Sequence, residues 1–222
     1  NTGLALAMQQ ADFRTIKLPL RVNTNNVFIS PTHCAYLYGY LVVNDAGTDA
    51  FYTSYQYPFE AYAPTDPEYN DVFRVDTVQY KDYGHITYSE WQPDNTLALV
   101  GNGSRLFTFG SRSYQVFQYN NDVNNPFSSP DNAAGNIGIK APNSLAMLGN
   151  TVLWLGSSDI GDNGVFMIKD TQITRISTQD IEREITQIIN PENAYSSIWQ
   201  EHQHVFYSLT FEDSKKTLVY DV

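Results

Sequence analysis

The sequence predicts an all-β fold of the β-propeller type, with short antiparallel blades and one amphipathic helix. Aromatic residues make up 14% of the 222 residues, including 16 Tyr and 12 Phe, and such side chains suit the half-buried faces of β-sheets. Turn signals separate short apolar runs along most of the chain. One pattern of strand, turn and strand also recurs at a spacing of about 48 residues, and periods of this length are typical of propeller blades.

The internal repeat is clearest in the middle of the chain, where Leu97–Asn102 recurs as Leu145–Asn150. The next strand, Leu106–Gly110, recurs as Val152–Gly156. Further members are Val116-Phe117 with Val165-Phe166, a looser copy in Ile198–Gln200, His204–Leu209 and Leu218–Tyr220, and a candidate earlier unit in Cys34–Tyr57. The chain therefore holds about four units, at the low end of the four to eight blades of a propeller.

Each unit is expected to contain a hairpin, because Gly, Asn and Asp at the turns accept the required backbone angles. The expected strand pairs are Cys34–Val43 with Ala50–Tyr57, Leu97–Val100 with Arg105–Phe109, Ala146–Leu148 with Val152–Leu155, Val165–Ile168 with Gln172–Ile176, and His204–Phe211 with Thr217–Asp221. Asn26–Ser30 is a further short candidate strand. The apolar phase of the repeated strands places Leu153, Trp154, Phe166 and Phe206 in the core.

One helix is predicted near residues 178–189. Ser177 is the expected N-cap, with Asp180 completing a capping box, and Pro191 ends the helix. Its apolar positions are Ile181, Ile185, Ile188 and Ile189, spaced as one helical face. We expect this face to pack over a sheet edge, and binding of a partner is the alternative.

The N-terminal part is harder to assign. We expect residues 1–33 to form an arm or first strands, and residues 34–222 to form the propeller-like domain. The N-terminus lacks Met and the basic flank of a signal peptide. We therefore expect the sequence to be part of a longer chain.

The charge excludes several classes of function. Lys and Arg number 13 against 24 Asp and Glu, giving a net charge of −11, and such a surface repels nucleic-acid phosphates.

No apolar run reaches the roughly 18 residues of a membrane span. Cys34 is the single cysteine, so no internal disulfide is expected, and its apolar strand predicts a buried, inert thiol.

Two patterns resemble metal sites, but neither is complete. His202 and His204 have the spacing of one strand face, without an obvious third ligand. Asp159, Asp162 and Asn163 form an oxygen-rich loop, but the spacing of a calcium loop is missing. Solvated polar residues and turn chemistry are the favoured interpretations, so we expect no metal and no cofactor.

No catalytic constellation is recognised, and we expect no enzyme. Ser157–Gly161 matches the first part of an Asp-box turn, and Gly164 stands where its Trp belongs. Asp180 and Glu184 are best interpreted as solvated charges, because glycoside hydrolysis needs two carboxylates facing each other across a cleft.

The best candidate interaction surface is an aromatic-rich loop. Its members are Tyr55, Tyr57, Phe59, Tyr62 and Tyr69. Tyr is enriched at protein interfaces, whereas packing over blade edges would be the purely structural role. Both interpretations stay open.

Several segments, in order, resemble the packaged-DNA stabilisation proteins of short-tailed bacteriophages. They are Gly39–Val42, Leu106–Phe117, Asn125–Phe127, Ala141–Ser144, Trp154–Ser157, Arg175–Thr178 with Ile181-Glu182, Val205–Phe211 and Thr217–Asp221. The resemblance implies a virion protein, assembled in the host cytoplasm, that forms a ring below the portal and closes the DNA exit channel. Its implied partners are portal or adaptor proteins, the tail needle and tailspikes.

Two alternatives from other classes stay open at this point. One is a glycan-binding or sialidase-like β-propeller, and the other is an extracellular adhesion module.

Overall fold

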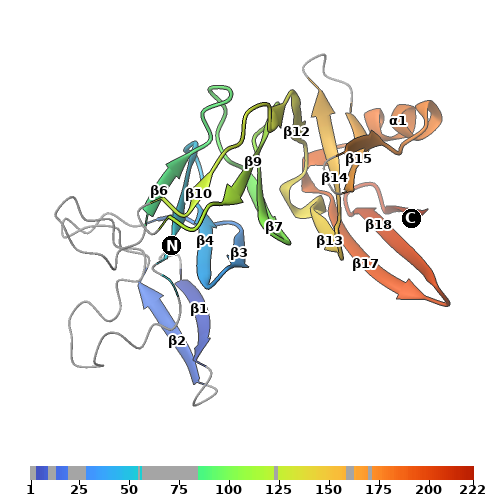
Figure 1. The fold of residues 1–222 in the computed structure, drawn as a ribbon. Helices are drawn as coiled ribbons and strands as arrows, with labels where there is room; N and C mark the ends of the chain where they lie inside the picture. Colours follow the sequence, from blue (N-terminus) through green and yellow to red (C-terminus); the bar gives the residue numbers. More distant parts are fainter. Residues whose placement is uncertain are drawn as a thin grey trace.

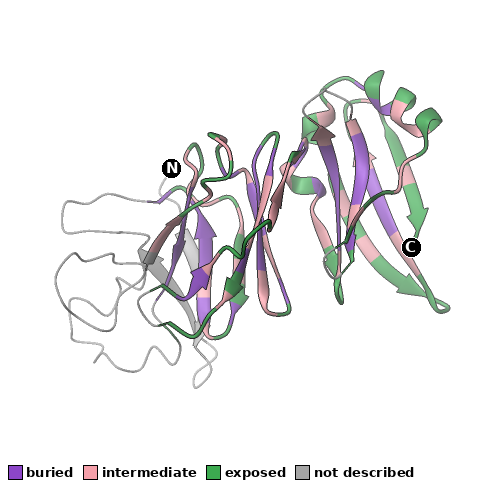
Figure 2. Ribbon diagram, turned by 45° about the horizontal axis from the view of Figure 1, so that its top comes forward, coloured by how far each residue is buried: buried purple, intermediate pink, exposed green. Residues whose placement is uncertain are grey.

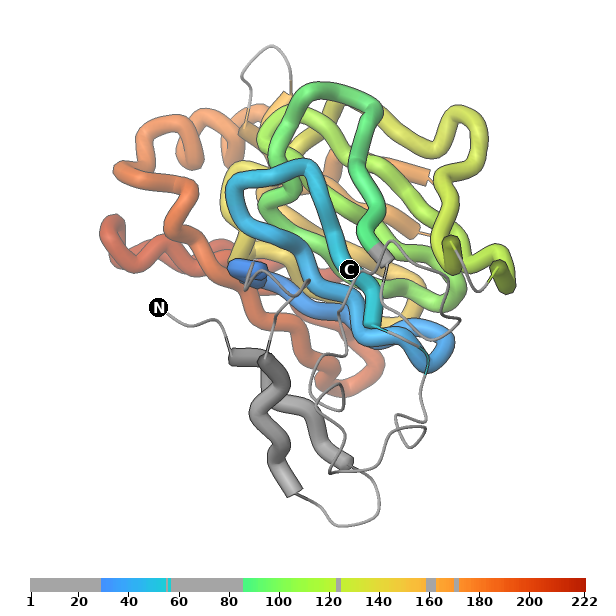
Figure 3. The backbone as a smooth tube through the Cα atoms, turned by 90° about the vertical axis from the view of Figure 1, so that its left-hand side faces the viewer, coloured from blue at the N-terminus to red at the C-terminus, as the bar shows by residue number. Residues whose placement is uncertain are grey.

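The structure, a computed structural model, describes the strands β1 (Leu4–Gln9) and β2 (Arg14–Pro19) and residues 29–54, 56, 85–122, 125–158, 163–169 and 172–222. Strands β1 and β2 pair as an antiparallel hairpin. Within the described part of the chain, the remaining strands form four antiparallel sheets that follow one another in chain order. Figure 1 shows these sheets side by side in a row, and Figure 3 looks along the row from its N-terminal end.

The four sheets correspond to the four predicted repeat units. Sheet 1 contains β3 (Cys34–Leu37), β4 (Tyr40–Asn44), β5 (Ala50–Thr53) and β6 (His85–Tyr88). Sheet 2 contains β7 (Ala98–Asn102), β8 (Arg105–Phe109), β9 (Tyr114–Tyr119), β10 (Phe127–Ser128) and β11 (Ala134–Gly135). Sheet 3 contains β12 (Ile137–Ile139), β13 (Ala146–Leu148), β14 (Thr151–Ser158), β15 (Asn163–Lys169) and β16 (Gln172–Arg175). Sheet 4 contains β17 (Tyr195–Glu201), β18 (His204–Phe211) and β19 (Lys216–Asp221).

Among the described residues, successive sheets pack face to face through three apolar cores, and Figure 2 shows buried residues along their strands. Core A, between sheets 1 and 2, consists of Leu37, Tyr40, Val42, Phe51, Leu99, Leu106, Phe117 and Phe127. Core B, between sheets 2 and 3, consists of Ala98, Phe107, Phe109, Ile139, Val152, Trp154, Phe166 and Ile168. Core C joins sheet 3 to sheet 4 and the helix, and it consists of Ala141, Leu153, Leu155, Val165, Ile185, Ile188, Ala194, Tyr207, Leu209 and Phe211. The row of sheets is therefore held together by alternate side chains from the two faces of each inner sheet.

Most predicted hairpins are confirmed, and one strand needs correction. The predicted strand 34–43 is broken at Tyr38 and Gly39, whose φ angles of 50° and 84° belong to a tight turn. Leu37 then pairs with Tyr40, so β3 and β4 form a hairpin of their own. The turns at Gly103 and Gly149 have φ angles of 60° and 56°, as their predicted role requires.

The predicted core is confirmed at three of four positions. Leu153 and Trp154 are fully buried, and Phe166 is 5% exposed. Phe206 is only partly buried, because its side chain lies on the face of sheet 4 that points away from core C. Trp199 stacks on it, with ring centroids 5.5 Å apart.

The helix α1 spans Gln179–Thr186, slightly shorter than predicted. Its N-cap is Thr178, which makes no capping hydrogen bond through its side chain. Ile185 and Ile188 are buried in core C. Ile189, however, is 69% exposed.

Candidate interaction surfaces

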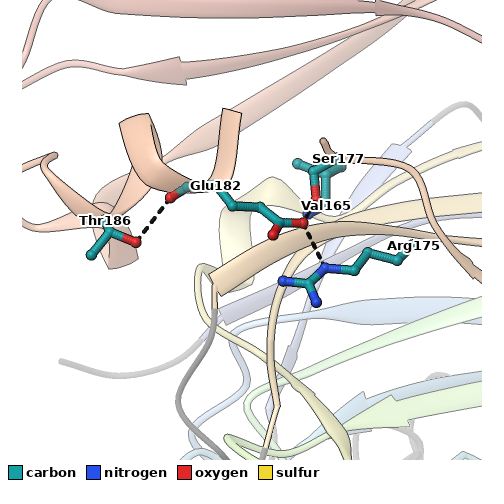
Figure 4. Close-up of polar contacts among 5 residues, drawn as sticks. All are labelled: Val165, Arg175, Ser177, Glu182 and Thr186. Atoms are coloured by element: carbon teal, nitrogen blue, oxygen red, sulfur yellow. Dashed lines mark hydrogen bonds and ion pairs between the residues drawn. The ribbon is translucent and has the colours of Figure 1, made fainter. Parts of the chain in front are cut away.

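Helix α1 is held on sheet 3 by a polar network around Glu182 (Figure 4). Its Oε1 lies 2.6 Å from the Nε of Arg175 and accepts a hydrogen bond from the Ser177 hydroxyl, also at 2.6 Å. Ser177 in turn accepts the backbone N–H of Val165 at 3.0 Å. Thr186 donates to the Glu182 carbonyl at 2.9 Å.

This network explains why Ser177 does not cap the helix. Its hydroxyl joins the β15 backbone to the Glu182 carboxylate, and Glu182 is only 16% exposed. The guanidinium of Arg175 also lies over the Phe166 ring, 5.8 Å from its centroid, a cation–π arrangement. The sequence shows an Arg and a Glu seven positions apart, but only the fold brings them together.

The packing of helix α1 decides between its two interpretations, packing within the chain and binding of a partner. Ile185 and Ile188 occupy core C, so the apolar face is already used within the chain. The outer face is charged: Asp180 pairs with Arg183 at 3.3 Å, with side chains 90% and 70% exposed. Glu184 lies 3.8 Å from Lys216. The expectation that Asp180 and Glu184 are solvated charges is confirmed.

The His pair does not form the predicted strand face. His202 lies in the turn between β17 and β18, with a φ angle of 46°. His204 begins β18, and its Nδ1 lies 2.8 Å from the Asp221 carboxylate. Among the residues that the structure describes, no three His, Cys, Asp or Glu side chains are grouped to hold a metal ion.

Two further candidates fall on residues 159–162, which lie outside the described part of the chain. Asp159 and Asp162 belong to the oxygen-rich loop, and Asp159, Ile160 and Gly161 complete the partial Asp-box. Both motifs therefore stay predictions. Ser157 and Asn163, which flank them, pair across β14 and β15.

The five residues of the predicted aromatic surface also lie outside the described part of the chain, and the surface stays a prediction. They are Tyr55, Tyr57, Phe59, Tyr62 and Tyr69. The hairpin of β3 and β4 nevertheless presents exposed aromatic side chains. Tyr36 is 61% exposed, and the ring of Tyr38 stacks on Tyr119 with centroids 4.3 Å apart. Gln56 donates a hydrogen bond to the Tyr38 carbonyl at 3.0 Å.

Cys34 lies on β3, the strand that also carries Tyr36, and the expectation that its thiol is buried is wrong. Its residue is exposed rather than buried. Strand β3 is the edge of sheet 1, and Ala35 and Leu37 face core A. Cys34 and Tyr36 alternate with them and therefore face away.

One carboxylate that the sequence did not single out organises a loop of sheet 2. Asp94 accepts hydrogen bonds from the Arg112 and Ser113 backbone N–H groups at 2.7 and 3.2 Å, and from the Ser111 hydroxyl at 2.8 Å. Partial burial by itself raises the pKa of Asp94, but these hydrogen bonds outweigh it and lower the pKa below its usual value. An ionised, fully paired carboxylate of this kind stabilises the loop.

No helix within the described ranges has the length and apolar character needed to cross a membrane. Comparison with curated proteins finds no match. Among solved structures, the computationally designed Ika4 protein is similar at 11% identity over 91% of this chain and 98% of that chain, with a TM-score of 0.44. Kluyveromyces lactis Hsv2 is similar at 12% identity over 96% of this chain and 64% of that chain, with a TM-score of 0.34. At these TM-scores the likeness supports no conclusion about fold or function.

A family model is more informative. The family described as Bacteriophage P22 Gp10, β-propeller, matches residues 65–222. The match covers more than half of the chain and runs from before β6 to the end of sheet 4. Its propeller class agrees with the antiparallel sheets that pack face to face along the chain. The chain therefore belongs to the bacteriophage P22 Gp10 family of phage stabilisation proteins.

Proposed function

We propose that this protein assembles below the portal of a short-tailed bacteriophage and closes the DNA exit channel. Its outer surface would then provide the docking site for the tail needle and tailspikes. The observation that carries this proposal is the family match over residues 65–222. The role is structural, and it involves no substrate and no cofactor.

The charge of the chain supports a plug that binds proteins rather than DNA. Duplex binding normally gains its affinity from several Lys or Arg contacts that release counterions. The net charge here is −11. Four cations in or beside sheets 3 and 4 and the helix face carboxylates, namely Lys140, Arg175, Arg183 and Lys216.

Closure of the exit channel by binding to other proteins also suits the rotational symmetry of a portal. Several copies around a rotational axis form a ring, because cyclic contacts close on themselves. An acidic bore would repel DNA and so let it slide during ejection. We further propose that residues 34–222 form the propeller-like domain, with residues 1–33 as an N-terminal arm or first strands.

The proposal is tested by binding of the chain to purified portal complexes and, separately, to free duplex DNA. At about 0.15 M ionic strength we expect co-sedimentation with portals, and rings beneath them in negative-stain images. We expect no duplex binding under the same conditions. Micromolar or tighter duplex binding that falls steeply with salt would contradict the proposal, and so would failure to bind portals at any salt concentration.

A further inference from the structure

A cavity of about 300 Å³ lies between sheets 2 and 3. Its walls are largely apolar, with Phe107 and Val116 from sheet 2 and Ile168 and Ile173 from sheet 3. Both sheets are inner members of the row, so the chain itself bounds the cavity on its two sides. Ligand pockets have volumes of about 300–1,000 Å³ and combine apolar walls with a few polar groups. The cavity therefore has the size of a site for a small ligand.

The strand register explains why the two sheets leave this space. Phe107 pairs with Val116 on sheet 2, and Ile168 pairs with Ile173 on sheet 3. Phe107 and Ile168 are buried in core B, whereas Val116 and Ile173 are only partly buried. The layer of side chains between the sheets is thus complete near β8 and β15 and thins out toward β9 and β16. Because the space between packed sheets has the thickness of interdigitated side chains, an aromatic ring fits it as a further member of the layer.

Tyr114 provides a polar group at the cavity wall. Its partner in β11 is Gly135, and a Cβ atom at position 135 would lie 2.6 Å from Cε1 and 2.8 Å from the hydroxyl oxygen of Tyr114. The glycine therefore lets the Tyr114 ring lie across β11. Burial raises the pKa of Tyr114, so its hydroxyl is protonated at neutral pH. Within the described part of the chain, no hydrogen-bond partner of this hydroxyl is found, and it can therefore pair with a ligand.

Two charged side chains line the cavity, but they differ in how they are engaged. Arg105 has an interaction within the chain, and it lies opposite Gln118 across β8 and β9. Asp131 is exposed in the loop between β10 and β11. No hydrogen bond or ion pair of its carboxylate is found among the residues that the structure describes. Asp131 is therefore the charge that a cationic ligand would meet, and the net charge of −11 acts in the same direction.

We propose that this cavity binds a small aromatic amine. The ring lies between the apolar walls of sheets 2 and 3, where it continues the side-chain layer. The ammonium group pairs with the Asp131 carboxylate and donates a hydrogen bond to the hydroxyl oxygen of Tyr114. A neutral ligand of the same shape lacks the ion pair, and an aromatic carboxylate brings a second negative charge toward Asp131. Binding should therefore weaken in that order.

Methyl NMR of the 222-residue chain, labelled with carbon-13 at isoleucine, tests the proposal with phenethylamine, 2-phenylethanol and 3-phenylpropionate. Ile168 and Ile173 report on the cavity, and Ile185 and Ile188 of core C are internal controls. At neutral pH, phenethylamine should shift the Ile168 and Ile173 signals saturably, with a dissociation constant of about 1–10 mM. The alcohol should bind several-fold more weakly, and the carboxylate most weakly.

Asp131→Asn separates the charge of the cavity from its shape. It should weaken phenethylamine binding about two- to fivefold, the contribution of an exposed ion pair, and leave 2-phenylethanol binding unchanged. The matched control Glu90→Gln removes the same charge from an exposed side chain that does not line the cavity, and it should change neither. Val116→Phe should abolish binding of both probes, because the added ring occupies the cavity.

Three results would overturn the inference. The first is the absence of saturable shifts up to about 20 mM phenethylamine. The second is an equal shift of the core C signals, which would show non-specific binding. The third is tighter binding of 3-phenylpropionate than of phenethylamine, which would show that Arg105 sets the charge preference. The inference does not rest on the proposed function, because the test uses the isolated chain without portals.

Discussion

The substitution Trp154→Ala tests the packing of core B. Trp154 is fully buried, and its ring lies against Phe109 and Phe166 with centroid distances of 5.0 and 5.8 Å. Its Nε1 donates a hydrogen bond to the Gly138 carbonyl at 3.1 Å. Truncation of a buried Trp costs about 3–5 kcal/mol, and the buried carbonyl left without its partner adds about 1 kcal/mol or more. We therefore expect the free energy of unfolding to fall by about 4–6 kcal/mol, a large part of the stability of a typical domain.

Guanidinium unfolding followed by circular dichroism measures this loss. Trp199→Ala is the matched control, since Trp199 is 39% exposed and its truncation should cost no more than about 1.5 kcal/mol. If Trp154→Ala unfolds the chain entirely, Trp154→Phe still tests the reasoning. It keeps an aromatic ring and removes the N–H that pairs with Gly138, at a cost of about 1–3 kcal/mol. Equal losses for the two alanine variants, or a loss below about 1 kcal/mol for Trp154→Ala, would refute the reasoning.

Three further predictions concern polar groups. Glu182→Gln should lower the free energy of unfolding by about 1–2 kcal/mol in the same assay, because Arg175 loses its charged partner; the control Glu184→Gln, at an exposed pair of 3.8 Å, should cost less than about 0.5 kcal/mol. The lowered pKa of Asp94 means that its contribution is present above the pKa of the unfolded chain and is lost as the pH falls through the lower folded value. Acid titration of stability should therefore lose this component in Asp94→Asn, and an unchanged acid profile would contradict the assignment. The exposed Cys34 should react with a thiol reagent in the folded chain at the rate of a small model thiol, whereas reaction only after unfolding would show a buried side chain.

The sequence predicts the sheets well because each blade is formed locally. The Asn-Gly turn at Gly103 and the apolar runs on either side bring β7 and β8 together within a few residues. The same pattern around Gly149 forms β13 and β14. The apolar phase of the repeated strands also predicts core positions, and Leu153 and Trp154 are buried as expected.

The failures arise where an interaction depends on distant parts of the chain. Ser177 has the sequence of a helix cap, yet a backbone N–H of β15 and the Glu182 carboxylate compete for its hydroxyl. His202 is a local error instead: its spacing from His204 predicts one strand face, but it occupies the turn that reverses β17 into β18. Asp94 shows no motif at all, because its partners lie about 17 to 19 positions further along the chain.

Phe206 illustrates a different limit, and it bears on how repeat sequences are interpreted. The alternation of β18 correctly assigns it to the face opposite Tyr207, just as Phe107 lies opposite Leu106 in β8. Whether that face is buried depends on whether a neighbouring sheet covers it, and alternation carries no information about the neighbour. A repeat therefore specifies a surface made for packing before any partner is present. Phe206 therefore follows the repeat pattern and is still an error in the predicted core, because its face is only partly buried.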